Sequence, residues 1–195
     1  MKLDENGRMI EFGEFPALET EHLILRQMTL DDAEFYLRHF SEPTVIELTA
    51  FEAPANIDAA REELLLFCID NFKANTGIRW GVMKKGGTDL IGTLGFHQWV
   101  KEGGYHARAG YDLVPGERGK GIMTEAFSAV VDYAFMEMRL NRIEVLIAPE
   151  NEASIRLVKK LGFKFEGILR EHSLFRREFL DDAVYSLLSS EWTKK

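Results

Sequence analysis

The sequence predicts one α/β domain built on a mixed sheet. Two observations favour this fold class. Apolar spacing switches between helical and strand-like periods around glycine turns, and the second half runs strand, helix, strand, helix, strand, strand. The chain has 195 residues, of which 46% are hydrophobic, so one sizeable core can form. No internal repeat or linker to a second domain is evident in the sequence.

The first half is expected to hold an arm, two helices and a meander of strands. Residues 1–17 are mixed and contain glycine, so we predict an N-terminal arm that precedes a single domain at 18–195. Pro43 and Pro54 bracket a loop-rich stretch, and Gly86-Gly87 and Gly103-Gly104 mark turns between strands. The predicted elements are a strand at 22–26, helices at 31–40 and 56–72, and strands at 78–83, 90–99 and 107–114.

The second half alternates more regularly. Gly162 stands where the C-cap of a helix belongs, and Asn151 stands at a favourable N-cap position. The predicted elements are a helix at 123–138, a strand at 142–148, a helix at 152–161, and strands at 163–169 and 183–190.

Composition narrows the class of protein. The net charge is −8, which argues against nonspecific nucleic-acid binding and suits a cationic substrate such as an amine. No stretch approaches the ~20 apolar residues of a membrane span, and the start has no apolar signal core, so we expect a cytoplasmic protein with no membrane partner. Cys68 is the only cysteine and is predicted to be a buried structural thiol. The five histidines lack metal-ligand spacing, so no metal is expected.

The segment at 114–126 (Val-Pro-Gly-Glu-Arg-Gly-Lys-Gly-Ile-Met-Thr-Glu-Ala) joins a strand to a helix through three glycines. Glycines let the backbone N–H groups point one way, and a helix N-terminus adds unpaired donors and partial positive charge. This combination predicts an anion site, and phosphate is its usual ligand. The spacing fits neither a P-loop nor a dinucleotide fingerprint, because only two residues separate Gly116 from Gly119 and position 124 is threonine.

A second segment at 149–163 (Pro-Glu-Asn-Glu-Ala-Ser-Ile-Arg-Leu-Val-Lys-Lys-Leu-Gly-Phe) follows at a fitting distance. Together with Arg118-Gly119-Lys120-Gly121, it resembles the cofactor segments of the GNAT acetyltransferase superfamily, in its RimJ/RimL-like branch. The resemblance covers roughly residues 15–192 and departs from the family pattern at Met123. It implies the GNAT (acyl-CoA N-acyltransferase) fold, a strongly twisted mixed sheet flanked by helices. In that fold the strands expected near 107–114 and 142–148 splay apart to admit the pantetheine arm of CoA.

The resemblance also implies the activity and the site. The chain is expected to transfer an acetyl group from acetyl-CoA, its cosubstrate, to an amine. A backbone N–H near Leu113 or Val114 would act as the oxyanion donor, Asn151 would bond the pantetheine arm, and Ser154 would lie near the cofactor sulfur as the proton donor. Many relatives carry a tyrosine general acid at the position of Val158. The residues expected to bind the cofactor are Leu113, Val114, Arg118, Gly119, Lys120, Gly121, Ile122, Met123, Thr124, Asn151 and Ser154.

The general base is harder to predict. The family often has a glutamate where this chain has Arg108, in Arg108-Ala109-Gly110-Tyr111. The remaining candidates are His97, Asp112, Glu171 and His172, of which we retain His97 and Glu171, with Ser154, as the predicted catalytic residues.

Three functions stay open on the sequence. The first is acetylation of a protein N-terminal α-amine, as in ribosomal-protein N-acetyltransferases. The second is acetylation of a small-molecule amine, either a polyamine or an aminoglycoside. The third is a non-catalytic GNAT module that binds acyl-CoA, because a fold does not fix a function. The sequence leaves a homodimer open, and it does not identify the acceptor, whose recognition is expected to depend on residues 41–55, 97–105 and 170–181.

Overall fold

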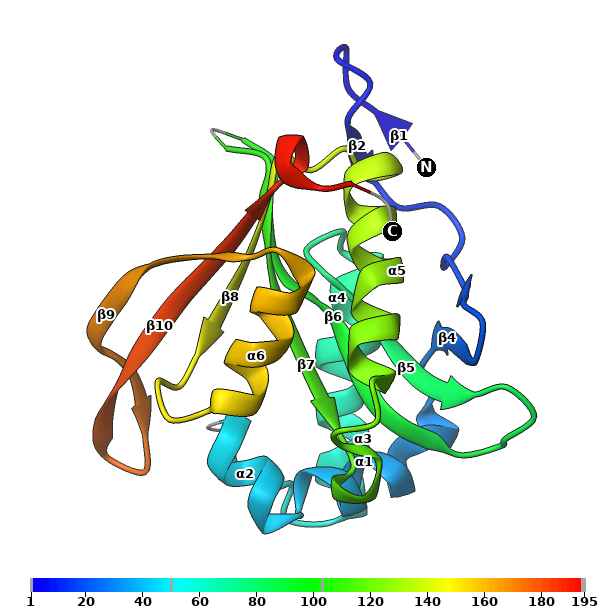
Figure 1. The fold of residues 1–195 in the computed structure, drawn as a ribbon. Coiled ribbons are helices and arrows are strands. Elements are labelled where there is room, and N and C mark those ends of the chain that lie inside the picture. The colour runs from blue at the N-terminus through cyan, green and yellow to red at the C-terminus, as the bar shows by residue number, and fades with distance from the viewer. Residues whose placement is uncertain (1, 50, 103, 194–195) are drawn as a thin grey trace.

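The computed structural model describes residues 2–49, 51–102 and 104–193. An eight-stranded sheet forms the centre, in the order β3-β4-β5-β6-β7-β8-β10-β9, and a separate two-stranded hairpin, β1-β2, lies at the start of the chain (Figure 1). Neighbouring strands are antiparallel, except that β7 and β8 run parallel. The strands are β1 Lys2–Leu3, β2 Met9–Glu11, β3 Leu18–Glu19, β4 Leu23–Gln27, β5 Ile78–Lys84, β6 Leu90–Val100, β7 His106–Leu113, β8 Arg142–Ile147, β9 Lys164–Phe175 and β10 Glu178–Leu188.

Helices cover both faces of the sheet. In Figure 1, α5 and α6 lie in front of it, whereas α3 and α4 lie behind it. Buried side chains of α5 and α6 belong to the larger hydrophobic cluster, and those of α1 and α3 belong to a second, smaller one. The α-helices are α1 Ala33–Phe40, α2 Pro43–Thr49, α3 Ile57–Leu64, α4 Asn71–Lys73, α5 Ile122–Met136 and α6 Glu152–Leu161. Short 3₁₀ turns lie at Leu30–Asp32, Pro115–Glu117 and Ser189–Glu191.

The α6 helix begins and ends where the sequence predicts. The Asn151 side chain accepts a hydrogen bond from the Ser154 N–H at 3.1 Å, which satisfies a donor of the first turn. Gly162 ends the helix in the left-handed region, with φ of +97°. These caps fix the helix start at the end of β8, beside the cleft described below.

Three sequence predictions need correction. The stretch between Pro43 and Pro54 holds a helix, α2, in which Pro43 is the first residue, a position where proline is favoured. The helix predicted at 56–72 is interrupted by a π-helical segment, Leu65–Asp70, between α3 and α4. Of the final two strands, β9 continues to Phe175, well past the predicted end at 169, and β10 begins at Glu178 and ends at Leu188 instead of spanning 183–190. Because most of β9 is exposed, apolar alternation does not mark its extension.

The first residues pack against the domain. Met9 is buried and donates its N–H to the carbonyl of Met138 at 3.3 Å, and the ring of Phe12 packs on Trp99. The Cys68 thiol is buried as predicted, and burial raises its pKa to about 11, so it stays protonated at neutral pH. Within the described ranges, no helix is long and apolar enough to span a bilayer.

The parallel strands β7 and β8 separate part-way along their length. Their pairing runs from His106 opposite Arg142 to Ala109 opposite Val145, whereas β7 continues to Leu113 and β8 to Ile147. The strands diverge beyond this point, and the expected splay is confirmed (Figure 1). Since backbone groups on the facing edges then lack ladder partners, the split can hold an extended ligand.

Candidate active site

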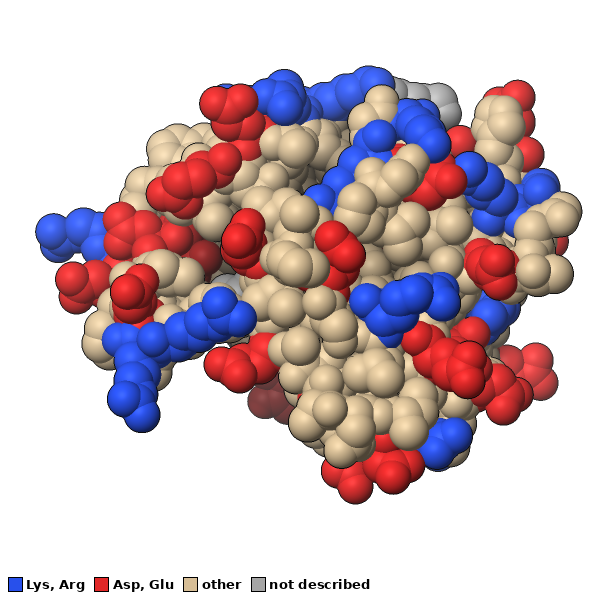
Figure 2. All heavy atoms as spheres, turned by 90° about the horizontal axis from the view of Figure 1, so that it is seen from below, with Lys and Arg blue, Asp and Glu red and all other residues tan. Residues whose placement is uncertain are grey.

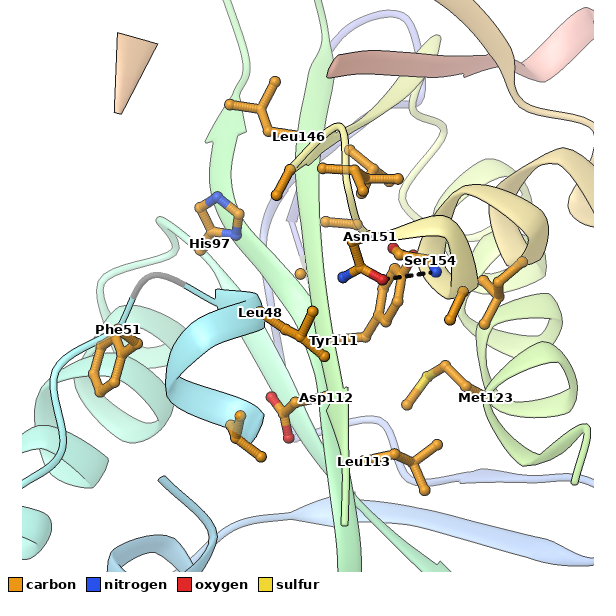
Figure 3. Close-up of a pocket in the computed structure, with 18 of the residues that line it drawn as sticks. Leu48, Phe51, His97, Tyr111, Asp112, Leu113, Met123, Leu146, Asn151 and Ser154 are labelled. Atoms are coloured by element: carbon orange, nitrogen blue, oxygen red, sulfur yellow. Dashed lines mark hydrogen bonds between the residues drawn. The ribbon is translucent and has the colours of Figure 1, made fainter. Parts of the chain in front are cut away.

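A cavity of about 990 Å³ occupies the split and opens on both sides of β7. One half is bounded by the start of α5 and by α6, and the other by α2, by β6 and by the β9-β10 hairpin. Figure 3 shows His97 and Asp112 on one side of β7, with Met123 and Ser154 on the other. After the roles that the family resemblance implies, we call these the acceptor half, which holds His97, and the cofactor half, which holds Ser154.

The glycine turn before α5 has the geometry of an anion cradle. Gly119 and Gly121 adopt φ of +76° and +81°, and a Cβ at either would meet no atom within 4 Å. No side chain of the described residues caps α5, so its first N–H groups are left for a ligand. Arg118 braces the turn by donating from Nε to the carbonyl of Leu113 at 3.0 Å. The Lys120 ammonium instead pairs with Glu117, at 3.2 Å between Nζ and Oε2.

Every second backbone N–H group of β7 points toward the split between β7 and β8. The Val114 N–H donates to the carbonyl of Ile91 at 2.9 Å, on the β6 side. Since successive N–H groups of a strand point to opposite edges, the Leu113 and Tyr111 amides point toward the split. Of the two predicted oxyanion donors, the Leu113 N–H therefore faces the cavity, whereas the Val114 N–H already donates to the carbonyl of Ile91.

The cofactor half brings three polar side chains together. The Ser154 hydroxyl shares a hydrogen bond with the Tyr111 hydroxyl, and Asn151 lies beside them at the start of α6 (Figure 3). Burial raises the pKa of Tyr111 to about 12, so the phenol stays protonated at neutral pH. Val158 is fully buried in the core. The hydroxyl nearest Ser154 thus comes from a strand and not from the helix position that many relatives use.

His97 reaches the acceptor half because of a β-bulge. Phe96 pairs with Ala109 and Gln98 with Arg108, so His97 is the extra residue and its ring faces the open cavity. Desolvation by the surrounding protein, together with the charges of Arg79 and Arg108, lowers the pKa of His97 to about 4. The imidazole is therefore neutral at pH 7 but a weak base.

Asp112 is the centre of a buried network and is not a free base. Its carboxylate accepts from Arg79 Nη2 at 2.5 Å, from His39 Nε2 at 2.7 Å and from Thr93 Oγ1 at 2.6 Å. Burial alone would raise the pKa of Asp112, but Arg79, His39 and Thr93 outweigh it and hold the pKa below its ordinary value. The network anchors Arg79 in the wall of the acceptor half.

The β9-β10 hairpin contributes His172 to the cavity, and Glu171 lies outside it. His172 Nδ1 is 2.8 Å from Asp182 Oδ2, and both residues line the acceptor half. Glu171 has a φ of +51°, and its amide donates to the Asp181 carboxylate at 2.8 Å. Glu171 lines a second hollow along the hairpin, which shares His172 and Asp181 with the main cavity.

Most of the predicted site residues meet at the cavity. Ten of them line it, and Val114, Lys120 and Glu171 are not among its lining residues. The ten are His97, Leu113, Arg118, Gly119, Gly121, Ile122, Met123, Thr124, Asn151 and Ser154. Among the described residues, no three His, Cys, Asp or Glu side chains gather as a metal site.

Residues 22–164 match the sequence model of the acetyltransferase (GNAT) domain. The chain belongs to the GNAT acetyltransferase family. It is 38% identical over 176 residues to an uncharacterized N-acetyltransferase, YoaA, of Bacillus subtilis, covering 89% of this chain and 97% of the relative. A ribosomal protein uS5-alanine N-acetyltransferase of Escherichia coli is 29% identical over 122 residues, 62% of each chain. The crystal structure of a probable acetyltransferase superposes with a TM-score of 0.81 at 28% identity, covering 92% of this chain and all of that one.

This GNAT chain is an acetyl-CoA-dependent N-acetyltransferase, and its cavity fits that cosubstrate. The open space above Gly119 and Gly121, the uncapped start of α5 and the free amide edge of β7 match a pyrophosphate followed by an extended amide-bearing arm.

Sequence reasoning missed two residues of this GNAT site. Tyr111 was read only as part of the motif around Gly110, although strand alternation places it on the face that α6 covers. Arg79 carries no motif and reaches the cavity only because β5 and β6 pair, so no local signal indicates it.

Proposed function

We propose that this enzyme acetylates the α-amino group of a protein N-terminus. The observation that carries the proposal is that His97 and Asp112, the two candidate bases on the β6 and β7 wall of the acceptor half, are both poor bases. His97 is a weak base with a pKa of about 4, and Asp112 is committed to its buried network. An α-amino group has an ordinary pKa near 8 and a lysine amine one near 10.4, so the α-amine supplies far more of the neutral nucleophile at pH 7.

The ribosomal protein uS5-alanine N-acetyltransferase of E. coli supports this choice of acceptor, because its substrate is a protein.

The cofactor half is proposed to hold acetyl-CoA, which supplies the activated acetyl thioester. The amides of Gly119 and Gly121 and the first turn of α5, with Ile122, Met123 and Thr124, would bind the pyrophosphate, braced by Arg118. Asn151 would donate its side-chain amide to the pantetheine arm. These residues fix the thioester in place, and such positioning is a large share of catalysis in a direct transfer.

The reacting end of the cavity is proposed to use three donors. The Leu113 N–H would donate to the carbonyl oxygen that gains negative charge. The Tyr111 and Ser154 hydroxyls form a connected pair that would donate to the sulfur. His97 would accept a proton through water rather than act as a strong base, and Glu171 remains a weaker candidate because its side chain lies outside the cavity.

The test is release of the CoA thiol from acetyl-CoA with a panel of amines, followed by mass spectrometry of the acceptor. The panel holds peptides that begin with Ala, Ser or Met, the same peptides with blocked N-termini, an N-blocked lysine peptide, spermidine and an aminoglycoside. We expect acetylation of free peptide N-termini alone. Preferential acetylation of spermidine, the aminoglycoside or the lysine peptide would overturn the proposal, and binding of acetyl-CoA without any transfer would favour the non-catalytic module.

A further inference from the structure

Arg108 is a cavity residue whose hydrogen-bonding capacity is unused. It stands on β7 in the wall of the acceptor half, and its side chain is only 24% exposed. Its Nε is buried with no hydrogen-bond partner, and no described residue accepts a hydrogen bond from the guanidinium. A guanidinium carries five N–H donors, and buried donors are rarely left unpaired in folded proteins. The unpaired donors point to a ligand that accepts them.

The positive charge of Arg108 is also poorly balanced. The nearest carboxylate, Glu144, is 3.9 Å from Nη2, and that same Glu144 already accepts from Arg142 Nε at 2.8 Å. The second arginine of this wall, Arg79, differs, because Asp112 neutralises it at 2.5 Å. A single loose contact with a shared carboxylate leaves net positive charge at Arg108.

The other carboxylates around the acceptor half do not reach Arg108. Asp182 accepts from His172 and Ser173, Asp181 accepts from the Glu171 amide, and Glu47 is exposed at the rim on α2. Figure 2, which views the molecule from below, shows charges of both signs scattered around largely uncharged surface. The unbalanced positive charge of Arg108 thus lies inside the cavity and not on the surrounding surface.

Arg108 lies on the same face of β7 as Gly110, beside His97 and Arg79. Arg108 and Gly110 are two residues apart on β7, so they share a face of the sheet and stand about 7 Å apart. A Cβ at Gly110 would lie 3.4 Å from His97 Nδ1 and 3.7 Å from Arg79 Nη1. The His97 ring and the Arg79 side chain therefore lie directly over Gly110, and Arg108 stands beside them on the same face. One residue of an extended peptide spans about 3.3 Å, so a peptide whose α-amine lies near His97 would bring its first or second side chain to Arg108.

We propose that Arg108 binds a carboxylate of the acceptor, so that the substrates are peptide N-termini with Asp or Glu as the first or second residue. This inference rests on the proposed α-amine activity and adds its specificity. The guanidinium would pair with a carboxylate through its terminal N–H groups, which would balance the charge of Arg108. A main-chain carbonyl would satisfy a donor but would leave the charge unbalanced.

The experiment compares kcat/KM for matched peptides on the wild type, Arg108→Gln and Arg108→Lys. The peptides differ only at one position, as Ala-Glu against Ala-Gln and Ala-Lys, and as N-terminal Asp against Asn. Arg61→Gln is the control, because Arg61 is exposed, pairs with Asp58 on α3 and lies outside the cavity. Acetyl-CoA affinity and the unfolding midpoint of each variant verify that Arg108→Gln leaves the cofactor half and the fold intact.

We expect the wild type and Arg61→Gln to prefer the acidic peptide of one pair by at least about 10-fold, as a close charge pair at an interface provides. Arg108→Gln should remove the preference by raising KM for the acidic peptide while sparing the amide peptide. Arg108→Lys should restore only part of it. Peptides that are acetylated with no acidic preference, or with a preference that survives in Arg108→Gln, would overturn this inference and leave the proposed function standing. Failure to acetylate any peptide would overturn both.

Discussion

Replacement of Gly121 by alanine separates the role of the anion cradle from its effect on stability. Gly121 holds a φ of +81° at the start of α5, a conformation that costs an L-residue roughly 1–2 kcal/mol. A Cβ at this position meets no atom within 4 Å, so no steric clash adds to that cost. We therefore expect Gly121→Ala to lower the free energy of unfolding by about 1–2 kcal/mol.

The same substitution should weaken acetyl-CoA binding much more than the fold. The new methyl group would occupy the open space where the pyrophosphate is proposed to approach the helix N-terminus. Loss of one hydrogen bond to a charged group costs about 1.5–3 kcal/mol, which corresponds to roughly 10- to 150-fold in affinity. Titration calorimetry with acetyl-CoA measures this directly, and chemical denaturation measures the stability of the same sample. Gly121→Glu, which adds negative charge, should abolish binding while the chain stays folded.

Gly86 offers a matched control. It lies in the turn between β5 and β6, has a φ of +77°, and its Cβ would likewise meet nothing within 4 Å. Gly86→Ala should therefore lose a similar amount of stability and bind acetyl-CoA as the wild type does. If the two alanine variants bind acetyl-CoA equally well, the glycine turn before α5 is not the pyrophosphate site and the reasoning fails.

Three further outcomes can be measured. Ser154→Ala and Tyr111→Phe should each lower kcat more than they raise KM for acetyl-CoA. The double variant should have nearly the same kcat as either single variant, because the two hydroxyls form one hydrogen-bonded unit. Additive losses of kcat in steady-state kinetics would contradict a shared role. Asp112→Asn should lower the free energy of unfolding by about 3–5 kcal/mol, since it leaves a buried cation uncompensated, and a loss below about 1 kcal/mol would contradict the network. Because the folded-state pKa of Asp112 lies below its ordinary value of about 4, its contribution is complete above that pH and fades as the pH falls further, so the wild type should lose stability in acid more steeply than Asp112→Asn does. The kcat/KM for a peptide should rise with pH as the α-amine loses its proton near pH 8, and His97→Asn should leave this rise unchanged. A rise near pH 6 to 7 that vanishes in His97→Asn would instead identify the histidine as the base.

Local sequence signals predicted the helices whose ends are marked by a glycine or by a capping side chain. Gly121 and Gly162 mark the beginning of α5 and the end of α6 by backbone conformations that glycine favours, and Asn151 marks its own helix by a side-chain cap. The extended β9-β10 hairpin escaped prediction for the opposite reason. Its middle faces solvent, so the apolar alternation that reveals a strand is absent.

The acceptor half shows why a motif alone cannot define a site. His97 enters the cavity because a bulge in β6 adds one residue against β7, and Arg79 enters because a neighbouring strand carries it there. Both depend on register, which is a property of strand pairs and not of a local stretch of sequence. The cofactor half is different, because the turn at 118–121 and the cap at Asn151 are each complete within a few consecutive residues.

The short pairing between β7 and β8 makes the stability of the folded chain depend on the concentration of its cosubstrate. Only four residue pairs of the described chain join the two halves of the sheet there, and the rest of the boundary is open to whatever occupies it. A ligand that bridges both edges binds the folded chain alone and so adds RT ln(1 + [L]/Kd), about 2.7 kcal/mol at a concentration 100 times Kd.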